Sequence, residues 1–158
     1  MKAHKPLMTL GFILFFGMVP MEGGLASDGG GNPPTRLEPC PRSPNCVSSL
    51  AVDERHAIPP LIYAGPLEEA REALLGVLKA APRVTLVAGE PDYLHAEFRS
   101  RVFGFVDDVE FFFPAGQQVI HVRSASRSGY FDFGVNRKRI EGIRRHLETA
   151  LPAKGDEK

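Results

Sequence analysis

Residues 93–124 read YLHAEFRSRVFGFVDDVEFFFPAGQQVIHVRS, and this stretch decides the fold. Apolar and polar side chains alternate along three runs within it, residues 93–99, 107–113 and 118–124, which is typical of β-strands buried on one face. The Phe-Gly-Phe and Pro-Ala-Gly segments between them predict short turns, so we expect the strands to pair antiparallel. A fourth strand is expected just upstream, at residues 83–88.

The alternation gives the expected sheet one apolar face and one charged face. The side chains predicted on the apolar face are Leu94, Ala96, Phe98, Val109, Phe111, Phe113, Ile120 and Val122. The side chains predicted on the charged face are His95, Glu97, Arg99, Asp108, Glu110, His121 and Arg123. Such a sheet needs helices over one of its faces only.

Two amphipathic helices are expected to provide this cover. The first follows Gly65-Pro66, carries an apolar stripe at helical spacing and ends at Pro82. The last spans about residues 136–151, with Asn136 or Asp132 as its cap. The predicted fold class is therefore α+β: a four-stranded, mainly antiparallel sheet with two helices packed on one face, in the order α-β-β-β-β-α.

The N-terminal segment is typical of a signal peptide. Lys2 and Lys5 precede an apolar run of 13 residues, residues 7–19, and small residues follow up to Ala26. A membrane-spanning helix needs about 20 residues, so cleavage near Ala26 is favoured over a permanent anchor. We therefore predict that residues 1–26 are a signal peptide and that the protein is exported, periplasmic or secreted. The alternative is an inner-membrane protein anchored by this segment.

Residues 27–60 are rich in Pro and Gly and predict a tether that precedes the α+β domain at residues 61–151. Its two cysteines, Cys40 and Cys46, are most simply joined in a disulfide, because an exported chain meets an oxidising compartment. A redox site would favour Cys-x-x-Cys, and zinc would need further ligands at suitable spacing. The last residues, 152–158, predict a disordered polar tail.

Composition limits the function more than it identifies it. The chain has 158 residues, 43% of them hydrophobic, which is typical of one globular domain. Its formal net charge is zero, so no overall electrostatic attraction to nucleic acid is expected. Basic residues are nevertheless concentrated in residues 123–146.

Three ordered blocks of sequence resemble a known family. They are CPRSPNCVSS at residues 40–49, GFVDDVEF at residues 104–111 and VRSASRSGYFDFGVNRKRI at residues 122–140. Together they are similar to the bacterial and plant family catalogued as domain of unknown function 1499, over roughly residues 40–147. Phe131 departs from the family pattern. That pattern has a smaller polar residue at this position. The resemblance implies no activity.

The third block is the predicted binding site. A strand end, a hydroxyl-rich loop and a helix N-terminus meet there, and arginines beside free N–H groups suit a phosphate, sulfate or carboxylate. The predicted ligand-binding residues are Arg123, Ser124, Ser126, Arg127, Asn136 and Arg137, with Asp107, Asp108 and Asp132 as supporting acidic residues. The alternative is structural: Arg127 and Arg137 pair with these aspartates to pin the loop, and Asn136 only caps the helix.

Signals for catalysis are weak. The serines lack a Gly-x-Ser-x-Gly elbow. Asp107 and Asp108 are neighbours on a strand and point to opposite faces, so salt bridges to Arg99 and Arg123 are the simpler role for them. His95 and His121 suit cross-strand ion pairs on the charged face better than a zinc site. No catalytic residue, cofactor or metal site is predicted.

The sequence therefore favours a non-catalytic binding module for a small anionic ligand or a cell-envelope component. The alternatives are a protein-interaction or envelope-structural module that uses the charged face, and an enzyme of unassigned reaction. The expected partners are a small anion or an envelope protein. Nucleic acid is not expected, and a membrane is expected only through an uncleaved leader.

Overall fold

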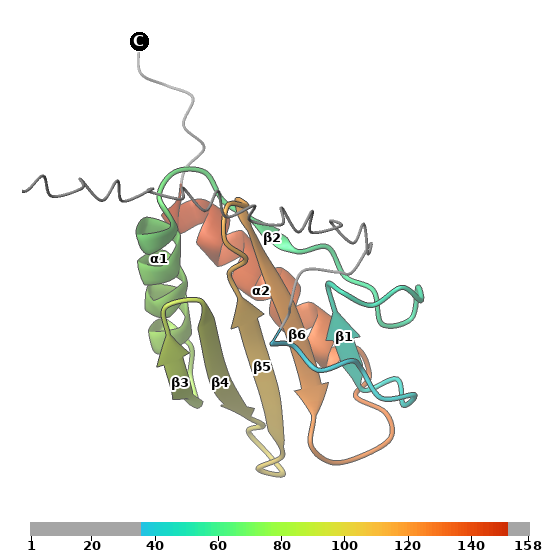
Figure 1. Cartoon of the computed structure of the whole chain (residues 1–158). Coiled ribbons are helices and arrows are strands. Elements are labelled where there is room, and N and C mark those ends of the chain that lie inside the picture. Colours follow the sequence, from blue (N-terminus) through green and yellow to red (C-terminus); the bar gives the residue numbers. More distant parts are fainter. Residues whose placement is uncertain (1–35, 152–158) are drawn as a thin grey trace, which may run out of the picture. The chain divides into compact units, whose positions relative to one another are not determined.

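A computed structural model describes residues 36–151 of the chain as an α+β domain (Figure 1). In chain order the elements are β1 (Cys46–Ser48), β2 (Leu61–Ile62), α1 (Leu67–Ala80), β3 (Val84–Glu90), β4 (Tyr93–Arg99), β5 (Val106–Phe112), β6 (Val119–Ser126) and α2 (Val135–Ala150). The predicted class, an antiparallel sheet with two helices, is confirmed. The expected leader, residues 1–26, and tail, residues 152–158, lie outside the described residues.

The sheet has six strands in the described part of the chain, rather than the four predicted. Its order is β1-β6-β5-β4-β3, with β2 also paired to β6, and every one of these strand pairings is antiparallel. One edge of β6 therefore carries both short strands, with Val47 opposite Ser124 and Leu61 opposite Ile120. Strands of three and two residues are too short to show alternation, so only their pairing with β6 defines them.

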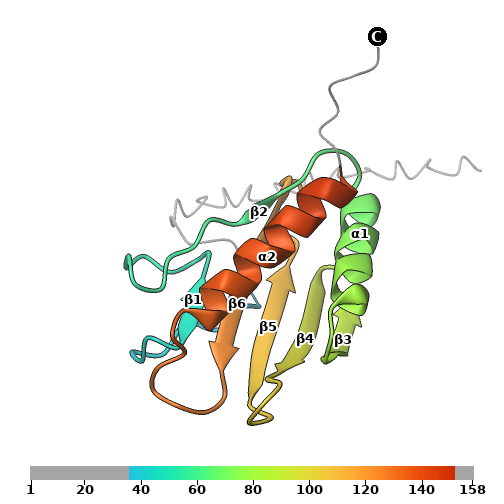
Figure 2. The ribbon, with the colours of Figure 1, turned by 180° about the vertical axis from the view of Figure 1, so that it is seen from behind.

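Both helices cover the same face of the sheet (Figure 2). Helix α1 begins after Pro66 and carries acidic residues in its first turn, where the helix dipole favours negative charge. Helix α2 begins after Gly134, whose φ of 74° suits glycine. Its N-terminal N–H groups are met by Asp132: the carboxylate accepts hydrogen bonds from the main-chain nitrogens of Gly134 and Asn136, both at 2.9 Å. Of the two predicted caps, Asp132 takes the role.

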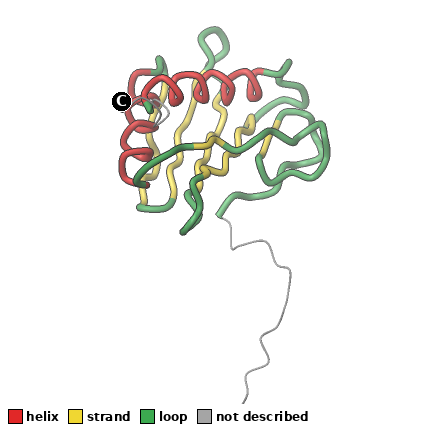
Figure 3. The backbone as a smooth tube through the Cα atoms, turned by 90° about the horizontal axis from the view of Figure 1, so that it is seen from above, coloured by secondary structure: helices red, strands yellow, loops and turns green. Residues whose placement is uncertain are grey.

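The core lies between the helices and the predicted apolar face of the sheet. Viewed from above, the helices form one layer against the strands (Figure 3). The fully buried strand residues include Leu94, Ala96, Val109, Phe111, Ile120 and Val122, as the alternation predicted. Leu74 and Leu78 of α1 and Ile140 of α2 pack against them. Neither helix within residues 36–151 is long and apolar enough to cross a membrane.

Part of the predicted tether belongs to the folded domain. Residues 36–60 contribute β1, and Val47 and Ile58 join the hydrophobic core. At the start of this segment Arg36 donates hydrogen bonds to the Glu90 carboxylate and lies over the ring of Tyr93, 4.7 Å from its centroid. The Pro-rich composition opposes helix and long strands, but it does not prevent close packing.

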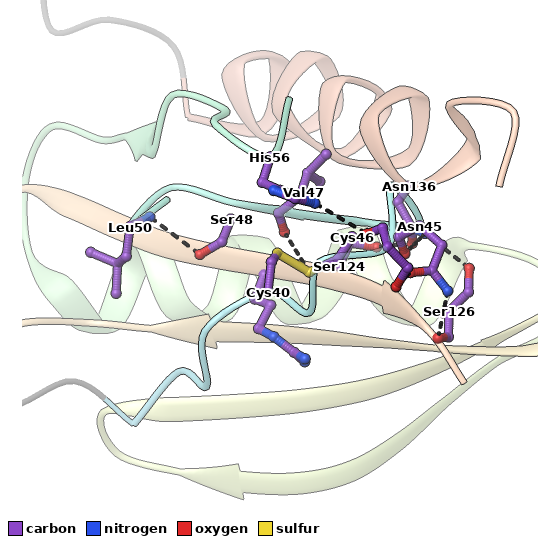
Figure 4. The surroundings of a disulfide bond; sticks show 12 residues. Cys40, Asn45, Cys46, Val47, Ser48, Leu50, His56, Ser124, Ser126 and Asn136 are labelled. Carbon is purple, nitrogen blue, oxygen red and sulfur yellow. Dashed lines mark hydrogen bonds between the residues drawn. A yellow bond between two sulfur atoms is a disulfide. The ribbon is translucent and has the colours of Figure 1, made fainter. Parts of the chain in front are cut away.

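Cys40 and Cys46 form the predicted disulfide, with a Cα–Cα distance of 5.7 Å (Figure 4). The bridge closes the Pro-rich loop just before β1, and Cys46 is buried at the edge of β6. It therefore fixes the turn that leads the chain into the sheet.

Replacing both cysteines, as Cys40→Ala/Cys46→Ala, is expected to lower the free energy of unfolding by about 2 kcal/mol, because so short a loop constrains the unfolded chain only modestly. Urea denaturation of the oxidised protein and the variant measures this difference. Reduced wild-type protein is the matched control and should match the variant. Equal stability of oxidised and reduced protein would contradict the stabilising role.

Candidate functional site

The predicted ligand-binding residues do not converge on one point, because alternation along β6 divides them. Ser124 and Ser126 lie on the helix side of the sheet, where they contact Asn136 (Figure 4). Arg123 and Arg127 lie on the charged face, where they pair with carboxylates of neighbouring strands. Arg137 lies apart from both groups and donates a hydrogen bond of 3.1 Å to the main-chain carbonyl of Arg55.

On the helix side, Asp107, Ser124, Ser126, Asn136 and Arg139 form one hydrogen-bonded group, which we call the polar cluster. Asn136 is its centre and is fully buried. Its Oδ1 accepts hydrogen bonds from Ser124 Oγ and from Arg139 Nη1, both at 2.6 Å. Its Nδ2 donates to Ser126 Oγ at 3.0 Å. Asn136 thus ties β6 to α2, and its side chain does not cap the helix.

The polar cluster also holds the loop that leads into β1. Asn136 Nδ2 donates to the main-chain carbonyl of Asn45 at 2.9 Å, and the main-chain nitrogen of Ser126 donates to the same oxygen at 3.0 Å. The Asn45 side chain donates in turn to the carbonyl of Gly129 at 2.6 Å. The loop before β1 is therefore joined to β6 and α2, which are distant from it in sequence, around one buried amide (Figure 4).

Arg139 is a central residue of this cluster that the sequence prediction did not include. It is ion-paired with Asp107, donates to Ser124 Oγ at 3.0 Å and lies over the Phe98 ring, 4.9 Å from its centroid. Its side chain and that of Asp107 are 12% and 11% exposed, so this ion pair is largely buried. A signal was available, because residue 139 is one turn after Asn136 and adjacent to the buried Ile140.

The charged face carries a second set of interactions that crosses the strands. Arg123 pairs with Glu110 at 2.6 Å, and Tyr93 donates a hydrogen bond of 2.7 Å to the same carboxylate. Arg127 contacts Asp108 at 2.7 Å and Glu97 at 2.6 Å. Hydrogen bonds from Arg127 hold the pKa of Asp108 below its usual value.

These pairings correct the predicted partners of the two aspartates. Asp107 and Asp108 do point to opposite faces, but their partners are Arg139 on one side and Arg127 on the other, rather than Arg99 and Arg123. His95 also contacts Asp108, at 2.7 Å, which confirms the cross-strand pairing expected of it. Within residues 36–151, no three His, Cys, Asp or Glu side chains are grouped so as to hold a metal ion.

His121 lies partly buried beside β1, with its Nδ1 3.1 Å from Ser49 Oγ. Burial lowers the pKa of its imidazole below the usual value of about 6.5, because the charged form is less solvated in the folded protein. The unfolded chain therefore binds the proton at higher pH than the folded domain does. Stability is then lost as the pH falls through 6.5 toward the lower pKa of the folded state.

We expect His121→Gln to remove this part of the pH dependence. Between about pH 7.5 and about pH 5.5, where an unperturbed histidine titrates, the free energy of unfolding of the variant should decline less than that of wild type. Denaturant unfolding at the two pH values measures the change. His146→Gln, which replaces an exposed imidazole on α2, is the matched control. Equal declines for wild type and His121→Gln would contradict the role of His121.

Two loops at the end of the sheet next to the polar cluster carry large apolar side chains in solvent. These loops, residues 100–105 and 127–134, together with Val135 at the start of α2, are called the aromatic end. The exposed side chains, between 46% and 89% accessible, are Val102, Phe103, Phe105, Tyr130, Phe131, Phe133 and Val135. Exposed apolar groups gathered in this way mark interaction surfaces more often than single ones do.

Within the aromatic end, one residue has an unusual backbone conformation and neighbouring rings contact each other. Phe133 has a φ of 53°, in the left-handed region, and is the most exposed of the group at 89%. A bulky residue rarely adopts this conformation, and such strain is concentrated at functional sites. The rings of Phe103 and Phe105 stack with centroids 5.5 Å apart, and those of Tyr130 and Phe131 meet edge to face at 4.8 Å.

A cleft of about 370 Å³ lies between the two loops. Phe103, Phe105, Phe131 and Phe133 line its sides together with Arg101. Asp107 and Ser126 also line it, so the cleft reaches the polar cluster. Its volume is in the range of small-molecule sites in proteins. Sequence reasoning missed this surface because it treated the Phe-Gly-Phe segment as a turn only, although large apolar residues are uncommon in turns.

The fold and this site define a small disulfide-bonded α+β domain that presents an aromatic cleft at one end of its sheet. The sequence model of the family described as protein of unknown function (DUF1499) matches residues 36–147. The chain therefore belongs to this family, as the three sequence blocks predicted. No curated protein matches the chain.

Proposed function

We propose that the domain is an exported, non-catalytic binding module that attaches to a component of the cell envelope through its aromatic end. The observation that carries the proposal is the set of seven large apolar side chains exposed on two adjacent loops and at the first residue of α2. Their contact with water is unfavourable, by roughly 25 cal/mol for each Å² of apolar surface, and a partner that covers them removes this cost. The disulfide and the leader-like N-terminus support an extracytoplasmic location.

The polar cluster supports a binding role over a catalytic one. Asp107 is ion-paired with Arg139, and the Asn136 amide is hydrogen-bonded at both its oxygen and its nitrogen. Groups held in this way stabilise the loops that carry the aromatic residues. A catalytic acid or base must also reach the substrate, whereas Asn136, at the centre of the cluster, is fully buried.

We still expect the ligand to be anionic, but its charge would be bound by other residues than the arginines predicted from the sequence. Arg123, Arg127 and Arg139 are neutralised by carboxylates. Arg101, by contrast, lines the cleft and has no ion pair with a described residue. An envelope component with an apolar part and an anionic group is complementary to this arrangement.

The test is retention of the full chain on an isolated envelope fraction. Phe103→Ser/Phe133→Ser is expected to weaken retention at least about tenfold, because two rings can no longer be buried on contact. Val52→Ser/Val87→Ser, which changes exposed apolar residues elsewhere, is the matched control and should be retained like wild type. All variants carry the same N-terminal segment, and their melting temperatures should agree. Equal retention of the two double variants would overturn the proposal.

A further inference from the structure

We propose that the envelope component is the surface of an anionic phospholipid bilayer, into which the rings of the aromatic end insert. This inference rests on the proposed function and names its partner. It differs from the expectation that any membrane contact is made by the leader.

The first support is the position of the two loops. Asp107 of β5 pairs with Phe98 of β4 on one side and with Ser126 of β6 on the other, so both loops leave the sheet at the same end. A hydrogen bond of 3.1 Å from the Arg127 nitrogen to the Val106 carbonyl keeps their bases together. Figure 1 shows the β4–β5 turn and the β6–α2 loop at the same end of the domain. Because the two loops lie side by side, their exposed side chains can insert into one flat surface at the same time.

The second support is the chemistry of the tips. Phe103 and Phe133 are among the most exposed of the large apolar side chains, and neither belongs to the core. A lipid surface can close around side chains that project in this way, whereas a protein partner must offer a matching pocket for each ring. Exposed Phe side chains beside Lys and Arg are typical of segments that lie at the headgroup boundary.

The third support is charge complementarity. Residues 99–105 contain Arg99 and Arg101 and no acidic residue, and Lys138 follows on the first turns of α2. None of these three forms an ion pair with a residue of the described range 36–151. Asp132, the acidic residue of the second loop, is engaged in capping α2. The rim of the aromatic end is therefore positive, which favours anionic lipid headgroups.

The chain contains no tryptophan, so a single Trp reports the surroundings of one chosen position. We expect the fluorescence of full-length Phe103→Trp and Phe133→Trp to shift to the blue on vesicles that contain phosphatidylglycerol, and much less on phosphatidylcholine alone. Val52→Trp, far from the two loops in sequence and also exposed, is the control and should not shift. A local reporter distinguishes loop insertion from any binding by the N-terminal segment.

Charge variants test the same contact. Arg101→Gln is expected to weaken vesicle binding of Phe103→Trp about fivefold, the effect of one basic residue at an anionic surface. Arg145→Gln, which alters an exposed arginine near the other end of α2, should leave it unchanged.

The outcomes separate the two proposals. If envelope retention depends on Phe103 and Phe133 but neither Trp shifts on vesicles, the bilayer proposal fails and the proposed function stands with a protein or cell-wall partner. If retention does not depend on the rings, the proposed function fails, and the bilayer proposal with it. Equal shifts on the two vesicle types, or a shift that depends on protein concentration without vesicles, would also overturn the anionic bilayer as partner.

Discussion

Arg139→Met is expected to lower the free energy of unfolding by about 3 kcal/mol or more, because it removes one partner of a largely buried ion pair. The Asp107 carboxylate would lose its guanidinium partner in a site where it is only 11% exposed. Asn136 Oδ1 and Ser124 Oγ would each lose a hydrogen bond as well. Methionine retains most of the apolar stem, so the loss reports the charge and the hydrogen bonds. Urea denaturation with comparison of m-values measures it.

The double variant Arg139→Met/Asp107→Asn is the informative companion, since it removes both charges and leaves neither one buried alone. It should recover a large part of the lost stability. Lys138→Met, on the neighbouring exposed position of α2, is the matched control and should differ little from wild type. If Arg139→Met is as stable as Lys138→Met, the polar cluster does not hold the loops as described.

Phe111→Ala is expected to cost about 3–5 kcal/mol, because it empties the centre of the core. Phe111 is fully buried in β5 and lies between Leu94 and Val122 of the neighbouring strands. These β-sheet neighbours cannot collapse into the space without breaking their own register. Thermal and urea denaturation both measure the loss.

Phe103→Ala is the matched control for Phe111→Ala, because the same side chain is removed from a position that is 75% exposed. Its stability should stay close to that of wild type. A large loss for Phe103→Ala would mean that the aromatic end supports the fold, and its exposure could then no longer be attributed to binding. The pair therefore tests the core and the proposed surface together.

The elements predicted from local patterns are those that the structure confirms. The alternation in residues 93–124 identified three central strands and both faces of the sheet, and the helical stripes located α1 and α2. These patterns reflect burial on one side, which each segment encodes by itself. Strands β1 and β2 were missed because they depend on pairing with β6, a contact that no local pattern encodes.

At the candidate site the two-residue period of a strand separates neighbouring side chains. Asp107 and Asp108 point to opposite faces of the sheet, and so do Arg123 and Ser124. The predicted ligand set is therefore divided by a period that is already visible in the sequence. Arg139 and the links through Asn45 were harder to predict, because a buried amide is hydrogen-bonded to segments whose proximity only the tertiary fold creates.

The contact between Asn45 and Asn136 joins residues 91 positions apart, and β1 pairs with β6. A chain synthesised from its N-terminus therefore cannot complete this sheet until almost all of it has been made. Such non-local closure slows folding relative to a structure built from neighbouring contacts. Until β6 has been synthesised, Cys46–Ser48 lack the strand with which they pair, so this edge of the sheet forms late.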